Sequence, residues 1–287
     1  MKSLTSKRTG QLKDVLKRLY AKYNHFELIK PDPLQFVYKY SNPRDMEIAA
    51  FLAAGLAYGR VQQIEKSLEN LLGRMGDSPF EFVLCFDKDS RGVLADFKHR
   101  FTSGEDISDL LELLRDVLRQ HSSIEKYFLQ FFNSQDENVL SALSNFCGSL
   151  LEKYADKHNG SASRGLRYLL ARPSDGSVCK RLNLFLRWMV RDDEVDTGLW
   201  KSVEPAKLIV PVDVHMARLC KILGLYQTKT VILSSAVKIT KGFAQINPAD
   251  PVKYDFALSR IGIVEDCNGS YRLECEDCEL LEFCAFK

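Results

Sequence analysis

Four of the eight cysteines gather near the C-terminal end of this 287-residue chain. They are Cys267, Cys275, Cys278 and Cys284, in the pattern Cys-x7-Cys-x2-Cys-x5-Cys. Cysteine thiolates bind zinc and iron–sulfur clusters, and a Cys-x2-Cys step lets two sulfurs reach one metal centre. Zinc ribbons usually pair two such steps, whereas only one is present here. The spacing therefore favours an iron–sulfur cluster of the [4Fe–4S] type, with zinc as the alternative.

A second group of residues begins with the apolar run at 208–212 and continues through Asp213, Val214 and His215. Helical spacing of apolar residues then runs as far as Gly224, which places Asp213 at the N-cap of a helix. A carboxylate at a helix N-terminus stays ionised and can stabilise a positive charge that develops on a substrate. Asp213 is thus predicted to be a helix cap, and it is a candidate catalytic residue.

Upstream, residues 169–182 are predicted to form a helix, a tight turn and a second helix, with Pro173 and Gly176 in the turn. Lys180 falls in the first turn of the second helix, next to Arg181. The positive end of the helix dipole disfavours further positive charge there, and a lysine amine in its neutral form is a nucleophile. The alternative is that Lys180 is an ordinary surface charge.

These residues lie in a chain whose apolar periodicity is helical almost throughout, so we predict an all-α fold. Strand-like alternation is nearly absent. Residues 89–104 and 155–164 are polar, contain Gly or Ser, and are predicted to be connections. The segments with helical spacing are 9–23, 47–57, 61–75, 106–120, 124–132, 139–154 and 165–171. Asn42, followed by Pro43, is predicted to open the helix that contains residues 47–57.

The composition, 45% hydrophobic and 27% charged, is that of an ordinary globular protein. The longest apolar stretch, residues 46–58, is too short to span a membrane, and residues 1–8 lack the apolar core of a secretory signal. We therefore expect a cytoplasmic protein without a membrane partner, in which the cysteines are thiols or metal ligands.

Charge is uneven along the chain although the net charge is only +2. Residues 1–23 and residues 161–191 each hold seven Lys or Arg against a single Asp. Such blocks could line a surface that faces phosphates, or they could simply be solvated helix faces.

Taken together, these motifs resemble the helix-hairpin-helix DNA glycosylase superfamily. The segment Pro-Val-Asp-Val-His-Met at 211–216 is similar to that of the 8-oxoguanine glycosylases, and the cysteine tail resembles the Cys-x6-Cys-x2-Cys-x5-Cys loop of endonuclease III relatives. The first gap is seven residues here instead of six. The resemblance covers residues 165–287 and, more weakly, the Ala-rich run at 45–60. The whole chain also resembles a bacterial family without an assigned function.

The resemblance implies a DNA repair enzyme that excises a damaged base, such as an oxidised one, from double-stranded DNA and cleaves the abasic site as an AP lyase. Asp213 would stabilise the sugar cation, and Lys180 would attack the anomeric carbon. The hairpin around Gly176, with Arg172 and Arg181, would hold phosphate, and His215 would lie beside the DNA as a packing or hydrogen-bonding group. The four cysteines would hold the cluster, which staples the C-terminal loop.

The fold implied by the resemblance has two helical lobes. Residues 45–200 would form the lobe that ends in the hairpin, and residues 1–44 with 201–287 would form the second lobe with the cluster loop. We expect a monomer. Two alternatives stay open on the sequence alone: a DNA-binding protein of the same fold without catalysis, and a helical interaction protein clipped by zinc.

Overall fold

The protein is predominantly helical in the computed structural model, which describes residues 6–227, 230–263, 267, 271 and 273–284. Within these residues the only strands are β1 (Lys98–His99) and β2 (Thr102–Ser103), which pair in an antiparallel hairpin. The predicted all-α class is confirmed. No helix in the described part of the chain is both long enough and apolar enough to cross a membrane.

The chain divides into two compact units. The central unit comprises Ile29–Ser177 and Gly198–Ser202, and the terminal unit comprises Met1–Leu28, Val178–Thr197 and Val203–Lys287. The sequence predicted lobe boundaries at 44/45 and 200/201. The structure differs mainly in that residues 29–44 belong to the central unit and residues 178–197 belong to the terminal unit. Residues 178–197 join the terminal unit because buried arginines of that segment pair with acidic residues of the same unit, as described below.

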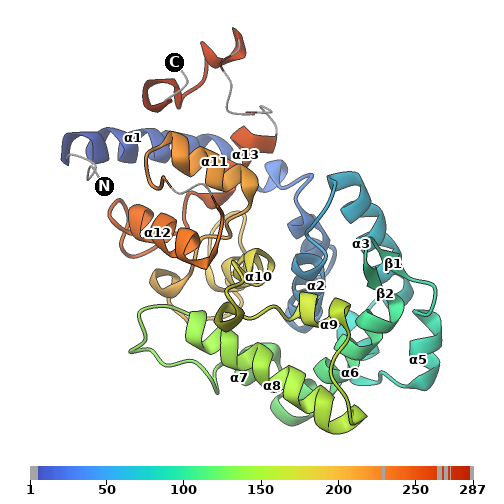
Figure 1. Cartoon of the computed structure of the whole chain (residues 1–287). Helices are drawn as coiled ribbons and strands as arrows, with labels where there is room; N and C mark the ends of the chain where they lie inside the picture. The colour runs from blue at the N-terminus through green and yellow to red at the C-terminus, as the bar shows by residue number, and fades with distance from the viewer. Residues whose placement is uncertain (1–5, 228–229, 264–266, 268–270, 272, 285–287) are drawn as a thin grey trace. The chain divides into compact units, whose positions relative to one another are not determined.

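The terminal unit is assembled from both ends of the chain and one internal segment (Figure 1). In α1 (Ser6–Tyr23), Leu12, Val15, Leu16 and Leu19 are buried on one face, as their spacing predicts, and this helix packs against α13 (Asp255–Ile263). The other α-helices of the unit are α10 (Lys180–Val190), α11 (Val214–Ile222) and α12 (Leu233–Ala244), with short 3-10 turns at Phe26–Leu28, Pro205–Lys207, Leu273–Cys275 and Leu281–Phe283.

The central unit packs its helices around α2 (Pro43–Gly55), whose residues 48–54 are buried. The Asn42 side chain accepts a hydrogen bond from the amide of Arg44 at 2.9 Å, so the predicted start of this helix is confirmed. The other helices of the unit are α3 (Val61–Met75), α4 (Pro79–Leu84), α5 (Lys88–Val93), α6 (Gly104–His121), α7 (Ile124–Phe128), α8 (Leu140–His158) and α9 (Arg164–Leu169), with 3-10 turns at Pro33–Lys39 and Pro173–Asp175.

Two predicted connections contain regular structure. Residues 89–104 include most of α5 and the β1–β2 hairpin, and α8 continues four residues into the segment 155–164. Capping explains α5, because the Asp87 carboxylate accepts hydrogen bonds from the amide and hydroxyl of Ser90, both at 2.9 Å. A polar segment can therefore be helical when its caps compensate for the missing apolar periodicity.

Glu47 is one of two buried acidic residues of α2, the other being Asp45. The Glu47 carboxylate accepts hydrogen bonds from the amides of Ile124 and Glu125, both at 3.0 Å, and from the indole of Trp200 at 2.8 Å. These two amides belong to the first turn of α7, where the helix dipole favours a negative charge. Burial raises the pKa of Glu47, and the three N–H donors oppose that rise. One carboxylate thus satisfies donors from two other segments of the unit.

We predict that Glu47→Ala lowers the free energy of unfolding by about 3 kcal/mol, because it leaves three buried N–H groups without an acceptor. Urea unfolding midpoints of the variant and the parent protein measure this loss. The matched control is Glu69→Ala, on the exposed face of α3, which is expected to change stability by less than about 0.5 kcal/mol. Equal losses in the two variants would contradict a structural role for the Glu47 carboxylate.

Candidate active site

Asp213 is the N-cap of α11, as the sequence predicts. Its Oδ1 accepts hydrogen bonds from the amides of His215 at 3.0 Å and Met216 at 2.9 Å. The preceding residues 208–212 are buried, so the chain emerges from the interior at Asp213. The Asp213 side chain retains 42% of its accessible surface. One carboxylate oxygen is therefore fixed by the helix, and the other is available to a neighbour.

That neighbour is Lys180, the first residue of α10. Its Nζ lies 4.0 Å from Oδ2 of Asp213, and its side chain is 28% exposed. This distance is longer than a hydrogen bond of 2.7–3.2 Å, so the pair is close without being locked together. Cys179, which is buried, has a left-handed backbone conformation (φ 50°) and turns the chain into α10. The structure thus brings together the two residues that the sequence singled out for chemistry.

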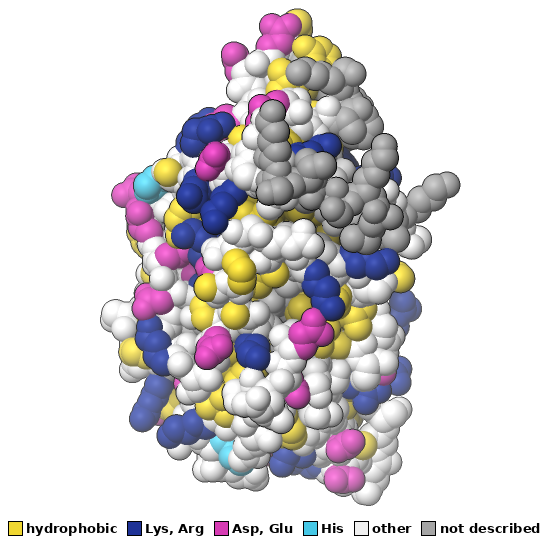
Figure 2. Space-filling view, turned by 90° about the vertical axis from the view of Figure 1, so that its left-hand side faces the viewer, with side chains coloured by type: hydrophobic (Ala, Val, Ile, Leu, Met, Phe, Trp, Pro, Cys, Tyr) yellow, Lys and Arg dark blue, Asp and Glu magenta, His cyan; other side chains and the backbone are white. Residues whose placement is uncertain are grey.

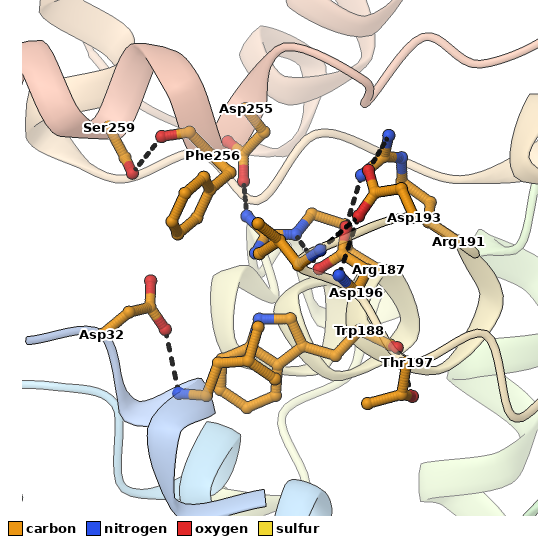
Figure 3. A network of polar contacts seen from close by, with 12 residues as sticks. Asp32, Arg187, Trp188, Arg191, Asp193, Asp196, Thr197, Asp255, Phe256 and Ser259 are labelled. Atoms are coloured by element: carbon orange, nitrogen blue, oxygen red, sulfur yellow. Dashed lines mark hydrogen bonds and ion pairs between the residues drawn. The ribbon is translucent and has the colours of Figure 1, made fainter. Parts of the chain in front are cut away.

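A buried ion-pair network fixes α10 against α13 beneath this pair (Figure 3). Arg187 lies two turns after Lys180, and its guanidinium donates to Asp255 at 2.5 Å and to Asp196 at 3.2 Å. Asp255 is the first residue of α13, and α13 also packs against α11. The helices that carry Lys180 and Asp213 are therefore both attached to α13.

Arg191, one turn further along, extends the network. Its side chain pairs with Asp193 at 2.8 Å, with Asp250 at 2.9 Å and with Asp196. The hydroxyl of Tyr20 in α1 donates to Asp193 at 2.9 Å, so the N-terminal helix is tied to the same cluster. Four carboxylates thus surround two buried guanidinium groups. This network was not predicted from the sequence, although Arg187 and Arg191, four residues apart at the apolar C-terminal end of α10, were a signal for it.

Asp255 is electrostatically coupled to the candidate site. Burial raises the pKa of Asp255 and the charge of Asp213 adds to the rise, whereas Arg187 and Lys180 oppose it. Burial also raises the pKa of the Cys220 thiol, with Asp255 and Asp213 contributing. The Cys220 side chain is also fully buried, so its thiol is not accessible to a substrate.

The residues predicted to hold phosphate are differently placed. In the central unit, Arg172 makes a two-point ion pair with Asp175, with both N–O distances at 2.9 Å. The amides of Ser174, Asp175 and Gly176 all donate within that unit, to Ser144, Arg172 and Pro173 respectively. These turn amides are already engaged, so phosphate binding there would have to compete with existing hydrogen bonds.

The other two predicted DNA contacts lie in the terminal unit. Arg181 is only 9% exposed, so a phosphate contact would require its side chain to move, whereas His215 is exposed beside Asp213. Arg187 and Arg191 are buried as well, so three of the seven basic residues of the block 161–191 are interior. On the face drawn in Figure 2, Lys and Arg side chains are interspersed with acidic ones. Only part of this block of positive charge is therefore available to a ligand at the surface.

All four C-terminal cysteines fall within the described residues, and each is partly exposed. Cys275 and Cys278 share one turn, in which the amide of Cys278 donates to the carbonyl of Cys275 at 3.1 Å. Leu280 and Phe283, which are buried, anchor this segment. The donor set fits a four-thiolate centre chemically. Among the described residues, however, no three His, Cys, Asp or Glu side chains are gathered closely enough to hold a metal ion.

We predict that Arg187→Met lowers the free energy of unfolding by about 3–5 kcal/mol, because it leaves Asp196 and Asp255 buried with fewer opposite charges. The comparison is Lys221→Met, an exposed position at the end of α11, where a change of less than about 0.5 kcal/mol is expected. Urea unfolding of the two variants measures the difference. A mild effect of Arg187→Met would show that α10 is held by apolar packing alone.

Comparison with known proteins gives one match. A protein family described as a protein of unknown function (DUF2400) matches residues 32–264, which include Lys180, Asp213 and the buried ion-pair network. No curated protein matches the chain. No solved structure matches it either. Because the match extends over most of its length, the chain belongs to the DUF2400 family.

Proposed function

We propose that this protein is a DNA glycosylase with AP-lyase activity, which removes a damaged base from duplex DNA and cleaves the resulting abasic site. The observation that supports this proposal best is the 4.0 Å separation of Lys180 Nζ and Asp213 Oδ2. The two residues are far apart in the sequence, and both remain partly exposed at the start of their helices. An amine and a carboxylate placed in this way can act on the same sugar.

In the proposed reaction the damaged nucleotide first leaves the base stack, because its glycosidic bond is unreachable inside the duplex. As the C1′–N bond breaks, the electron pair leaves with the base and positive charge develops on the sugar. The Asp213 carboxylate stabilises that charge. Its Oδ1 is already held by two amides, so Oδ2 can face the sugar without a loss of orientation.

Lys180 then supplies the nucleophile. Its ammonium group can give a proton to the nearby Asp213 Oδ2, after which the neutral amine attacks C1′. One proton of the attached amine passes to O4′ as the C1′–O4′ bond breaks, so the sugar ring opens and leaves a protonated Schiff base at C1′. Loss of a proton from C2′ expels the 3′ phosphate, and water releases the enzyme from the sugar. The buried pair of Arg187 and Asp255 acts only by holding α10 in position.

The C-terminal cysteines have a structural part in this proposal. Cys267, Cys275, Cys278 and Cys284 would hold a [4Fe–4S] cluster, which when bound would cross-link the C-terminal segment. Two contacts already tie this segment to the helices of the terminal unit. Arg218 of α11 donates to the carbonyl of Cys267 at 3.0 Å, and Lys22 of α1 pairs with Glu279 at 3.0 Å. The cluster carries no step of the base-excision reaction.

We predict that the protein forms a covalent adduct with duplex oligonucleotides carrying a single lesion when borohydride is added, because the reagent reduces the Schiff base. Across a panel of oxidised, alkylated and deaminated bases, Lys180→Ala should reduce the adduct at least about 100-fold. Lys221→Ala, an exposed lysine of α11, is the control and should react like the parent protein. A full yield of adduct from Lys180→Ala would assign the nucleophile to another residue.

A second variant separates the helix cap from the chemistry. Asparagine is also a good N-cap, so Asp213→Asn should leave unfolding almost unchanged. Base release should nevertheless fall by about 100-fold or more, because the neutral amide no longer stabilises the sugar cation. Unchanged turnover in Asp213→Asn would show that Asp213 only caps α11 and has no part in the chemistry. If the parent protein binds the lesion duplexes but releases no base from any of them, it is a binding protein and not a glycosylase.

We predict that protein purified without oxygen contains about four iron and four sulfide per chain and absorbs broadly in the visible range. The double variant Cys275→Ser, Cys278→Ser should lose both the iron and the colour. Cys85→Ser, at an exposed cysteine of the central unit, should keep them. Colourless protein that contains one equivalent of zinc per chain would show that the cysteines bind zinc and not an iron–sulfur cluster.

A further inference from the structure

The β1–β2 hairpin of the central unit is anchored firmly for so short an element. His99 is fully buried, with Nδ1 2.8 Å from the hydroxyl of Ser67 and Nε2 3.0 Å from the carbonyl of Tyr58. The hydroxyl of Tyr58 in turn donates to the carbonyl of His99 at 3.0 Å and lies 2.7 Å from the hydroxyl of Thr102. Each strand of the hairpin is therefore bound to Tyr58, and the turn between the strands is held in place.

This fixed turn presents an aromatic ring to solvent. Phe101, at the turn, is 51% exposed. Its ring is stacked on that of Tyr58, with a centroid distance of 5.0 Å and an angle of 29° between the planes. The ring of Tyr168, from α9, meets both rings edge to face, at 4.6 Å from Phe101 and 5.1 Å from Tyr58. Three rings thus form one cluster whose outermost member is half uncovered.

Arg100 completes the cluster in a strained conformation. Its backbone is left-handed (φ 55°), and its guanidinium lies 5.9 Å from the centroid of the Tyr58 ring. The side chain passes directly over Gly59, where an added Cβ would come within 2.9 Å of the Arg100 Cδ and Nη1 atoms. Gly59 also has a positive φ of 102°. Both the lack of space for a Cβ and the backbone conformation therefore favour glycine at this position.

A purely structural turn does not need these residues. Asn or Gly would adopt the left-handed conformation at Arg100 at lower cost, and a polar residue at Phe101 would avoid exposing a large apolar ring. Backbone strain and apolar exposure that are held in place by surrounding hydrogen bonds are typical of binding sites. The hairpin therefore presents Arg100 and Phe101 for a ligand.

The charges around this aromatic cluster indicate which kind of ligand it binds. Arg60 follows Gly59, Lys98 begins the hairpin, and Arg167 precedes Tyr168. In the described part of the chain, none of these three nor Arg100 forms an ion pair with an acidic side chain. Asp96, two residues before Lys98, pairs with Arg74, and Asp106 is buried in the capping box of α6. Aromatic rings flanked by unpaired basic side chains match a strand of nucleic acid, whose bases stack while its phosphates bind cations.

We propose that Tyr58, Arg100, Phe101 and Tyr168 form a stacking platform for an unpaired base of a DNA strand. The base lies on the exposed part of the Phe101 ring, and Arg100 with its basic neighbours binds the adjoining phosphates. Stacking tolerates any base, so the platform selects unpaired DNA over paired DNA and does not read sequence. This inference does not rest on the chemistry of Lys180 and Asp213, because stacking breaks no bond.

The test is binding of an undamaged, single-stranded oligonucleotide of about 20 thymidines with one central 2-aminopurine, measured at two salt concentrations. We expect Phe101→Ala to weaken binding about ten-fold or more and to remove the change in 2-aminopurine fluorescence that stacking produces. Phe101→Trp should restore both signals. Arg100→Ala should weaken binding and make it less dependent on salt, because one phosphate contact is lost.

The matched control is Phe26→Ala, since Phe26 is 50% exposed in the terminal unit and should leave both signals unchanged. Lys221→Ala, at an exposed lysine of α11, should also bind the oligonucleotide like the parent protein. Because the oligonucleotide carries no lesion, the platform and the proposed lyase activity can fail separately. Unchanged affinity and fluorescence in Phe101→Ala, with its unfolding midpoint also unchanged, would overturn the proposal. Equal weakening of binding to paired DNA and to the single strand by Phe101→Ala would overturn the selection of unpaired bases as well.

Discussion

The buried ion pair between Arg187 and Asp255 is the interaction on which the terminal unit depends. Neither charge is tolerable in the interior alone, and a buried charge that loses its partner costs several kcal/mol. The pair therefore restricts α10 and α13 to arrangements in which the two side chains meet. Lys180 lies on the same face of α10 as Arg187, two turns earlier, and α11 packs against α13. The contact between Arg187 and Asp255 therefore restricts where the start of α10, with Lys180, lies relative to Asp213.

The central unit also contains a buried charged side chain, but the partners of that side chain are of a different kind. In the terminal unit, two guanidinium groups are surrounded by several carboxylates, whereas Glu47 is a single carboxylate that meets only neutral N–H donors. Both arrangements join segments that are far apart along the chain. Apolar side chains would pack in several registers, but a hydrogen-bonded charge is satisfied in few of them. We infer that each unit uses a buried charge to select one packing of its amphipathic helices.

Sequence patterns predicted what depends on neighbouring residues and missed what depends on distant ones. Periodicity placed α1, α2 and α3, and cap chemistry identified Asn42 and Asp213, because those signals lie within a few residues. Arg181, Arg187 and Arg191 were grouped with surface charges, since nothing near them reveals that Asp250 and Asp255 follow more than fifty residues later. The β1–β2 hairpin was missed because two-residue strands have too little alternation to detect. The approach of Lys180 to Asp213 was expected from resemblance alone, and no local pattern encodes it.

The two candidate sites meet different physical requirements, and this explains their different construction. The proposed nucleophile must move during the reaction, and Lys180 lies near Asp213 without a short hydrogen bond to hold it there. A stacking surface gains most when it is rigid before binding, and the hairpin around Phe101 is fixed by hydrogen bonds on both strands. Taking a base out of a duplex costs a few kcal/mol of stacking and pairing. Stacking one unpaired base on an aromatic ring returns about 1–3 kcal/mol, a comparable amount. A protein that both opens DNA and breaks a glycosidic bond therefore benefits from having a rigid aromatic site in addition to a mobile catalytic pair.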